Sequence, residues 1–309
     1  MKNLICSVLV LTLALGTLAT QKHCYALALE GGGDRGAYQA GALYQIIMNH
    51  GDESVAYDVI SGIGAGAING AYLAQFAKGD EESAAQSLVA LWRGLTQDKV
   101  FKSWGWGGIV RGLLFETGIY NNSPLKKLLS TTLKAPKRKF LYGMTDAKTG
   151  KYIQKDETAK FEDYVKGILA SSSYAGIFPT VKDLDAGREY YDGSTVRSIN
   201  IADAVAQCKK LVGNDESKIT LDVIMNSGGT FKVKDASGFK AIRMGLRYLE
   251  ILYYYRSMDL ILRAKAAYKN LNFRYVVAPT SSLAGGLLPF NFEPKQIEEN
   301  INHGIKDAQ

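Results

Sequence analysis

The pattern that decides the fold is the stretch Tyr57-Asp58-Val59-Ile60-Ser61-Gly62-Ile63-Gly64-Ala65-Gly66-Ala67-Ile68-Asn69-Gly70. An apolar, β-branched run enters a cluster of small residues, and Ala, Ile and Leu at helical spacing follow it. This order predicts a strand, a tight turn and a helix, which is the geometry of a nucleophile elbow. The elbow pattern is G-x-S-x-G, and its five positions are filled here by Gly62, Ile63, Gly64, Ala65 and Gly66. Glycine therefore stands at the position of the nucleophile.

A second junction of the same kind lies upstream. The apolar segment 25–30 runs into the loop Gly31-Gly32-Gly33-Asp34-Arg35-Gly36, and residues 37–48 then have apolar side chains at helical spacing. Two strand–loop–helix units in succession predict a parallel sheet with helices packed on it. The glycine loop lacks the patterns G-x-x-x-x-G-K-[ST] and G-x-G-x-x-G, which weakens a nucleotide-binding interpretation.

The remaining chain continues this alternation of apolar strands and helical patterns. Residues 96–123 are expected to be rich in loops, and their glycine-rich segment Trp104–Gly108 is either a packed surface loop or a lid or membrane-facing flap. The tyrosine-rich helical stretch at 239–270 favours a core or interface role over ligand binding. Further strands are expected at 140–146, 152–153, 221–226 and 273–278, and further helices at 81–95, 124–133, 161–171 and 294–306.

Composition indicates a globular protein with a substantial core. The chain has 309 residues, of which 47% are hydrophobic and 22% charged, and its formal net charge is +7. A basic balance suits an anionic membrane surface or nucleic acid, but it can also serve solubility alone. The densest basic cluster, at 134–139, resembles a solvated loop, so no nucleic-acid partner is expected. We interpret residues 20–309 as one α/β domain.

The N-terminus predicts secretion. Lys2, an apolar core and a small-residue end form a signal peptide over residues 1–19, which places the mature protein outside the cell or in the lumen of the secretory pathway. Cys24 and Cys208 remain after cleavage, and the position of Cys24 in a core strand favours a buried thiol over a disulfide. His23, His50 and His303 are isolated from one another, so neither a metal nor a cofactor is expected.

Two more motifs complete a characteristic set. They are the segment from Ala170-Ser171 to Phe178-Pro179 and the dipeptide Asp192-Gly193. With these motifs in place, the chain resembles the patatin-like phospholipase family from about residue 25 to residue 307. The resemblance implies a three-layer α/β fold with a mainly parallel central sheet flanked by helices. It also implies hydrolysis of lipid acyl esters by a Ser–Asp dyad that uses no histidine.

The resemblance assigns a role to each motif. Asp192, which Gly193 follows, would be the base that takes the proton of the nucleophile. The loop that contains Arg35 and Gly36 would form the oxyanion hole through the backbone N–H groups of Gly31, Gly32 and Gly33. Gly64 occupies the nucleophile position and has no side chain to acylate. Ser61 lies three residues upstream of it, and Ser171 to Ser173 and Ser194 are not expected on a strand–helix turn.

Three functional hypotheses follow from these assignments. The first is a lipid-binding pseudoenzyme, whose partner is a lipid or fatty-acyl ligand and whose basic charge could also suit an anionic membrane surface. The second is a working lipid acyl hydrolase that uses another serine or a water activated by Asp192. The third is a structural or partner-binding module without a lipid pocket. The oligomeric state stays open.

Overall fold

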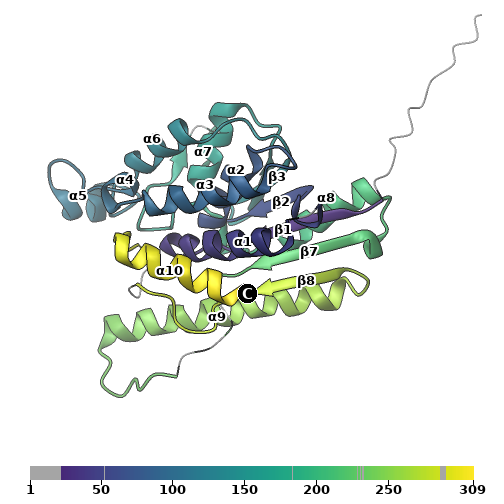
Figure 1. Cartoon of the computed structure of the whole chain (residues 1–309). Coiled ribbons are helices and arrows are strands. Elements are labelled where there is room, and N and C mark those ends of the chain that lie inside the picture. Colours follow the sequence, from purple (N-terminus) through teal and green to yellow (C-terminus); the bar gives the residue numbers. More distant parts are fainter. Residues whose placement is uncertain are drawn as a thin grey trace, which may run out of the picture.

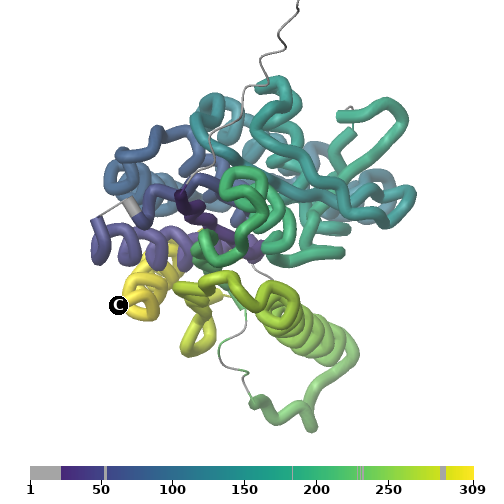
Figure 2. Tube along the Cα trace, turned by 90° about the vertical axis from the view of Figure 1, so that its right-hand side faces the viewer, coloured from purple at the N-terminus to yellow at the C-terminus, as the bar shows by residue number. Residues whose placement is uncertain are grey.

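A computed structural model describes residues 22–51, 53–182, 184–227, 229, 231, 233–285 and 290–309. The predicted signal peptide at 1–19 lies outside these residues. The described chain forms a twisted sheet covered by helices on both faces (Figures 1 and 2). The sheet order is β5-β6-β3-β2-β1-β7-β8, and β4 pairs with β3. Its strands are β1 Cys24–Leu29, β2 Val59–Gly62, β3 Lys139–Asp146, β4 Tyr152–Asp156, β5 Val181–Lys182, β6 Glu189–Asp192, β7 Ile219–Ile224 and β8 Asn272–Val277.

The centre of the sheet is parallel. Strands β3, β2, β1, β7 and β8 pair in this order in parallel register, with Leu29 opposite both Gly62 and Ile224. The carboxyl ends of β1, β2 and β7 therefore meet at one edge, where ligand sites of open α/β sheets lie. The residues of β1 are almost all buried and alternate between two cores, because helices cover both faces of the sheet.

An antiparallel margin extends the sheet beyond β3. Strand β4 returns along β3 after a tight turn, while β6 pairs with β3 and with the short β5. In this register Met144 of β3 lies opposite Asp192, the last residue of β6. The margin thus delivers Asp192 to the same edge at which the parallel strands end.

Helices cover the two faces unequally. Helices α1, α2 and α7 pack on one face, with α3 and α10 against α1, while α8 packs on the other face beside α9. The helices are α1 Gly36–His50, α2 Ala65–Ala74, α3 Glu81–Arg93, α4 Gln97–Val100, α5 Gly108–Phe115, α6 Ser123–Thr132, α7 Phe161–Ser171, α8 Ile201–Val212, α9 Ala241–Ala267 and α10 Pro294–Asp307. Short 3₁₀ turns are η1 Gly33–Arg35, η2 Glu53–Val55, η3 Gly193–Thr195 and η4 Glu216–Lys218.

These layers confirm the predicted fold class, but two local predictions were wrong and one helix was missed. Residues 108–115, expected in a loop, form α5, and helix α8 was not predicted. Cys24 and Cys208 form a disulfide between β1 and α8, with 5.7 Å between their Cα atoms, where a buried thiol was expected. The pairing depends on the packing of α8 against β1, a contact between residues far apart in sequence.

No helix within the described part of the chain is long and apolar enough to span a bilayer.

Candidate active site

The turn between β2 and α2 has the geometry of a nucleophile elbow. Gly64 has φ 59° and ψ −125°, a conformation that side chains rarely adopt. Its N–H group donates to the Ser171 hydroxyl at 3.1 Å, and its carbonyl accepts the N–H groups of Ala67 and Ile68. The predicted strand–turn–helix junction is therefore present, with Gly64 at its apex.

The flanking glycines make this turn possible. A Cβ atom on Gly62 would lie 2.1 Å from the carbonyl oxygen of Gly66, and a Cβ atom on Gly66 would lie 2.5 Å from the carbonyl oxygen of Leu29. Both distances are far below van der Waals contact with backbone atoms that cannot move aside. The small residues of the elbow thus reflect the close approach of α2 to the ends of β1 and β2.

Asp192 faces the apex from the end of β6. Its Oδ1 atom accepts the N–H group of Ser194 at 2.8 Å, and its own N–H group donates to the Ser173 carbonyl at 2.9 Å. A Cβ atom built on Gly64 lies 3.7 Å from Asp192 Oδ1. A hydroxyl at position 64 would stand one bond beyond that Cβ, within reach of a hydrogen bond to the carboxylate.

The pKa of the Asp192 carboxyl group is shifted towards neutral pH. Burial raises the pKa of Asp192 from 3.8 to about 6, while the hydrogen bonds from Ser194 oppose the rise. A carboxylate with this pKa is ionised at neutral pH yet basic enough to accept a proton, which is what a general base requires.

The glycine loop supplies fewer free donors than the sequence suggested. The N–H group of Gly31 donates to the Ser198 carbonyl at 3.1 Å and is thus occupied. Within the described residues, the N–H groups of Gly32 and Gly33 meet no hydrogen-bond acceptor. A Cβ atom on Gly36 would lie 2.4 Å from the Trp92 ring, so Gly36 serves the packing of α1 against α3.

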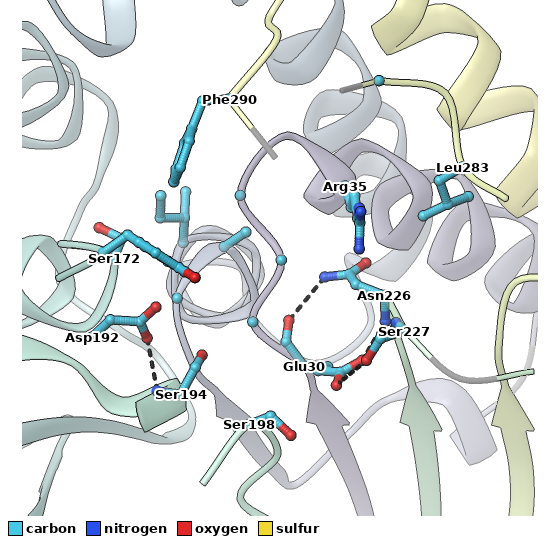
Figure 3. Close-up of a pocket in the computed structure, with 18 of the residues that line it drawn as sticks. Glu30, Arg35, Ser172, Asp192, Ser194, Ser198, Asn226, Ser227, Leu283 and Phe290 are labelled. Carbon is cyan, nitrogen blue, oxygen red and sulfur yellow. Dashed lines mark hydrogen bonds between the residues drawn. The ribbon is translucent and has the colours of Figure 1, made fainter. Parts of the chain in front are cut away.

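Arg35 lines the same cavity as the glycine loop. Its side chain lies beside Asn226 (Figure 3) and forms no ion pair with any described residue. Its charge interacts with the carboxylate of the neighbouring Asp34, and a guanidinium at the edge of a cavity can bind an anionic group of a ligand.

Glu30 is a buried carboxylate that the sequence analysis treated only as the end of a strand. Its Oε2 atom accepts the N–H groups of Asn226 and Ser227, at 2.6 and 2.9 Å. Its Oε1 atom accepts the hydroxyls of Ser227 and Ser257, and burial raises its pKa. Glu30 therefore ties β1, the end of β7 and α9 together beneath the glycine loop (Figure 3). The signal that could have revealed it is a carboxylate placed directly before three glycines.

An apolar cavity opens above these groups. Its volume is about 580 Å³, within the range of small-molecule pockets. The polar end contains Gly64, Asp192 and the glycine loop, with Phe290 over them in Figure 3. The lining also includes Tyr253 and Tyr254 of α9, which the sequence analysis had assigned to a core or interface role. Its apolar walls include Ile68, Leu125, Leu128, Leu129, Phe178 and Phe292.

The candidate serines differ in their surroundings. The hydroxyls of Ser171, Ser172 and Ser173 all form hydrogen bonds with neighbouring backbone or side-chain groups, and Ser61 donates to the Asn200 carbonyl at 2.9 Å. Ser194 lies in the three-residue 3₁₀ turn η3, directly after β6, and not at the apex of a turn into an α-helix as Gly64 does. Its buried hydroxyl interacts with the Asp192 carboxylate, whose pKa it lowers, and has no other hydrogen-bond partner within the described residues.

Comparison with known proteins places this site in a family. No curated protein sequence matches the chain. The crystal structure of VipD from Legionella pneumophila is similar with a TM-score of 0.48 and 11% sequence identity, covering 93% of this chain and 66% of that chain. The present chain thus spans slightly less than two thirds of that protein. The family model described as patatin-like phospholipase matches residues 27–205, which include the glycine loop, the elbow and Asp192. The chain belongs to the patatin-like phospholipase family.

Proposed function

We propose that this protein is a lipid-binding pseudoenzyme of the patatin-like family. The observation that carries the proposal is Gly64 at the apex of the elbow, 3.7 Å from Asp192 Oδ1 when a Cβ atom is built, with no side chain to acylate. The surrounding parts of a Ser–Asp dyad site remain: a buried base, two N–H groups without an acceptor among the described residues, and an apolar cavity. Such a site can bind an acyl group and polarise it without forming a covalent intermediate.

The ligand is a lipid or a fatty acid. The apolar walls of the cavity suit an acyl chain, and the N–H groups of Gly32 and Gly33, together with Arg35, suit a carbonyl or carboxylate at its end. Members of the family act on lipid substrates, which supports this ligand class. Native mass spectrometry of the purified protein should detect a bound fatty acid or phospholipid, and a cavity free of any lipid under these conditions would contradict the proposal.

The proposed location is the secretory pathway or the extracellular space. The predicted signal peptide motivates it, and the Cys24–Cys208 disulfide supports it, because disulfides persist in oxidising compartments. Mass spectrometry of the secreted chain should show an N-terminus near residue 20 and a mass two hydrogens below that of the reduced protein.

Gly64→Ser tests the assignment of the nucleophile position. The variant should react with a fluorophosphonate probe and hydrolyse short acyl esters, because its hydroxyl lies within reach of Asp192 and the probe fits the cavity. The double variant Gly64→Ser/Asp192→Asn is the control and should lose both properties. A folded Gly64→Ser protein that gains neither labelling nor turnover would show that position 64 is not the nucleophile position.

Ser194 supports a second candidate function, an active hydrolase. Its hydroxyl is buried, lies two residues from Asp192 in sequence and interacts with the Asp192 carboxylate, the group that would accept its proton. In this reaction the Ser194 proton passes to Asp192, and Oγ forms an ester with the acyl carbon. The alcohol leaves with that proton, and water then hydrolyses the ester. A water activated by Asp192 is the other route.

The same probe separates the two candidates. Labelling of the native chain that disappears in Ser194→Ala but persists in Ser172→Ala would favour the hydrolase. No labelling of the native chain, together with turnover of short esters that Asp192→Asn abolishes, would favour the activated water. If the native chain shows neither labelling nor turnover, the result supports the pseudoenzyme.

A further inference from the structure

An exposed apolar segment lies outside the cavity. We define the α5 arm as residues 103–117, which lead into and out of α5. Two backbone bridges hold its base, Lys102 to Asn121 and Gly118 to Gly176. The arm projects at one end of the molecule (Figure 1). Its exposed apolar side chains are Trp106, Ile109, Val110, Leu113, Leu114 and Phe115, with exposed fractions between 47% and 74%.

The exposed side chains form a continuous surface. Ile109 and Leu113 are four residues apart on α5, as are Val110 and Leu114, so the two pairs lie side by side on one face. Gly112 is the buried residue of α5, and it packs on the backbone of Ile119. The helix is thus held by a small residue on its inner side and presents its large apolar residues to solvent, which is typical of an interaction surface.

The arm carries no net charge. Its charged residues are Arg111 and Glu116, which form an ion pair with 2.7 Å between Nη2 and Oε1. The Arg111 guanidinium also lies 5.4 Å from the centre of the Trp104 ring and 5.7 Å from that of Trp106. A charge that is paired and shielded by aromatic rings costs less to move from water into a less polar phase than a free one.

Basic side chains flank the arm in the sequence. Lys102 precedes it, and Lys126 and Lys127 lie on α6, which follows it; all three residues are exposed. An apolar helix with exposed lysines in the flanking segments has the composition of segments that bind an anionic lipid surface, where the apolar residues enter the headgroup region and the lysines meet the headgroups. The formal net charge of +7 agrees with such a partner.

The base of the arm adjoins the cavity. The N–H groups of Ile119 and Tyr120 donate to the carbonyls of Gly176 and Ile177, at 3.0 and 2.9 Å, next to the cavity residue Phe178. Beyond the arm, α6 contributes Leu125 to the cavity wall. We propose that the α5 arm inserts into the headgroup–acyl boundary of an anionic lipid bilayer and so holds the cavity against a lipid source. This proposal rests on the proposed function only for its choice of a lipid ligand.

Vesicle sedimentation with matched variants tests the insertion. The purified protein should bind vesicles of phosphatidylcholine and phosphatidylserine more tightly than vesicles of phosphatidylcholine alone. Leu113→Glu should weaken binding to the mixed vesicles by roughly tenfold or more, because a charge replaces an inserted side chain. Leu262→Glu on α9 is the matched control, since Leu262 is 61% exposed and Leu113 is 62% exposed. It should bind like the native protein.

Tryptophan fluorescence gives a second measurement. The emission of Trp106, whose side chain is 74% exposed, should shift to shorter wavelength when mixed vesicles are added, and Trp106→Phe should remove most of this shift. Equal binding by the native protein, Leu113→Glu and Leu262→Glu would overturn the proposal, as would a native protein that does not bind mixed vesicles. If the native protein is a dimer that does not bind vesicles, and Leu113→Glu converts it to a monomer, the arm binds a second copy of the chain and the membrane proposal is overturned.

The two proposals fail separately. Leu113→Glu leaves the cavity intact and should still bind a soluble fatty acid in native mass spectrometry. Vesicle binding that depends on Leu113, in a protein that binds no fatty acid, would overturn the proposed function and leave the membrane arm. Fatty-acid binding without any vesicle binding would overturn the membrane arm and leave the proposed function.

Discussion

At the scale of single residues, the backbone conformation of Gly64 favours glycine, whereas catalysis by a Ser–Asp dyad would require a serine at this position. Its φ of 59° is strained for any residue with a side chain, and a Cβ atom would lie 3.2 Å from the Cα atom of Gly31. Gly64→Ala should therefore lower the free energy of unfolding by about 1–3 kcal/mol in urea titrations. Gly245→Ala, in open space on α9, is the control and should instead stabilise by about 0.5–1 kcal/mol. An equal response to both changes would contradict the strain at the elbow.

Asp192 should make stability depend on pH. Because burial raises its pKa from 3.8 to about 6, the folded protein keeps a proton that the unfolded chain releases between these values. Folding is then opposed as pH rises through this range, and the penalty persists above it. Asp192→Asn removes the titrating group, so it should raise the free energy of unfolding near pH 8 by about 1–3 kcal/mol.

The pH profile of this gain distinguishes it from a repacking effect. It should shrink between about pH 6 and pH 4 and vanish below the pKa of the unfolded carboxyl. Asp34, whose pKa burial also raises to about 6, contributes in the same direction to both proteins and cancels in the comparison. A gain that stays constant from pH 4 to pH 8 would contradict the assigned titration of Asp192.

At the scale of secondary-structure elements, α1 and α10 pack so closely that their contact leaves no room for larger side chains. A Cβ atom on Gly41 would lie 2.0 Å from the Ile301 carbonyl oxygen, and one on Gly304 would lie 2.0 Å from the Tyr38 carbonyl oxygen. The helices approach each other through glycines, so Gly41→Ala should lower the free energy of unfolding by about 1–3 kcal/mol through overpacking. Asn49→Ala, on the exposed end of α1, should change it by less than about 0.5 kcal/mol in the same assay.

The disulfide joins β1 to α8 across 184 residues of sequence. Removing it with Cys208→Ser should lower the free energy of unfolding by about 2–5 kcal/mol, because the unfolded chain regains the freedom that the crosslink removes. Denaturant titration with and without reductant checks this. The native protein should respond to reductant, whereas Cys208→Ser should not. A native protein unaffected by reductant, with its disulfide shown to be reduced, would refute the stabilising role.

At the scale of the whole molecule, the cavity links ligand binding to stability. A ligand that binds only the folded protein stabilises it by about 2.7 kcal/mol at a hundredfold excess over its Kd. Decanoate should therefore raise the unfolding temperature, while acetate, which shares the carboxylate but lacks the chain, should leave it unchanged. Equal shifts with both acids would indicate a carboxylate effect unrelated to the apolar walls.

The parts of the site that the sequence predicted are those that short-range patterns specify. Glycines at fixed spacing between a β-branched run and a helical run specify a strand–turn–helix junction, because each residue type acts on its own backbone. The elbow at 62–66 and the glycine loop at 31–36 were identified in this way, whereas the role of the Asp-Gly turn at 192–193 came from the family resemblance. The elbow and the glycine loop meet at one sheet edge because β1 and β2 are parallel, whereas Asp192 reaches that edge through the antiparallel strand β6.

The tertiary structure decided what depends on contacts between distant segments. It placed Cys208 against Cys24, engaged the N–H group of Gly31 with Ser198, and buried the Ser194 hydroxyl beside the Asp192 carboxylate. The sequence by itself determined that position 64 has no nucleophile. Only the folded chain showed how near that position lies to Asp192, because the distance is set by the register of β6 on β3 and by the close packing of α2 on the strand ends.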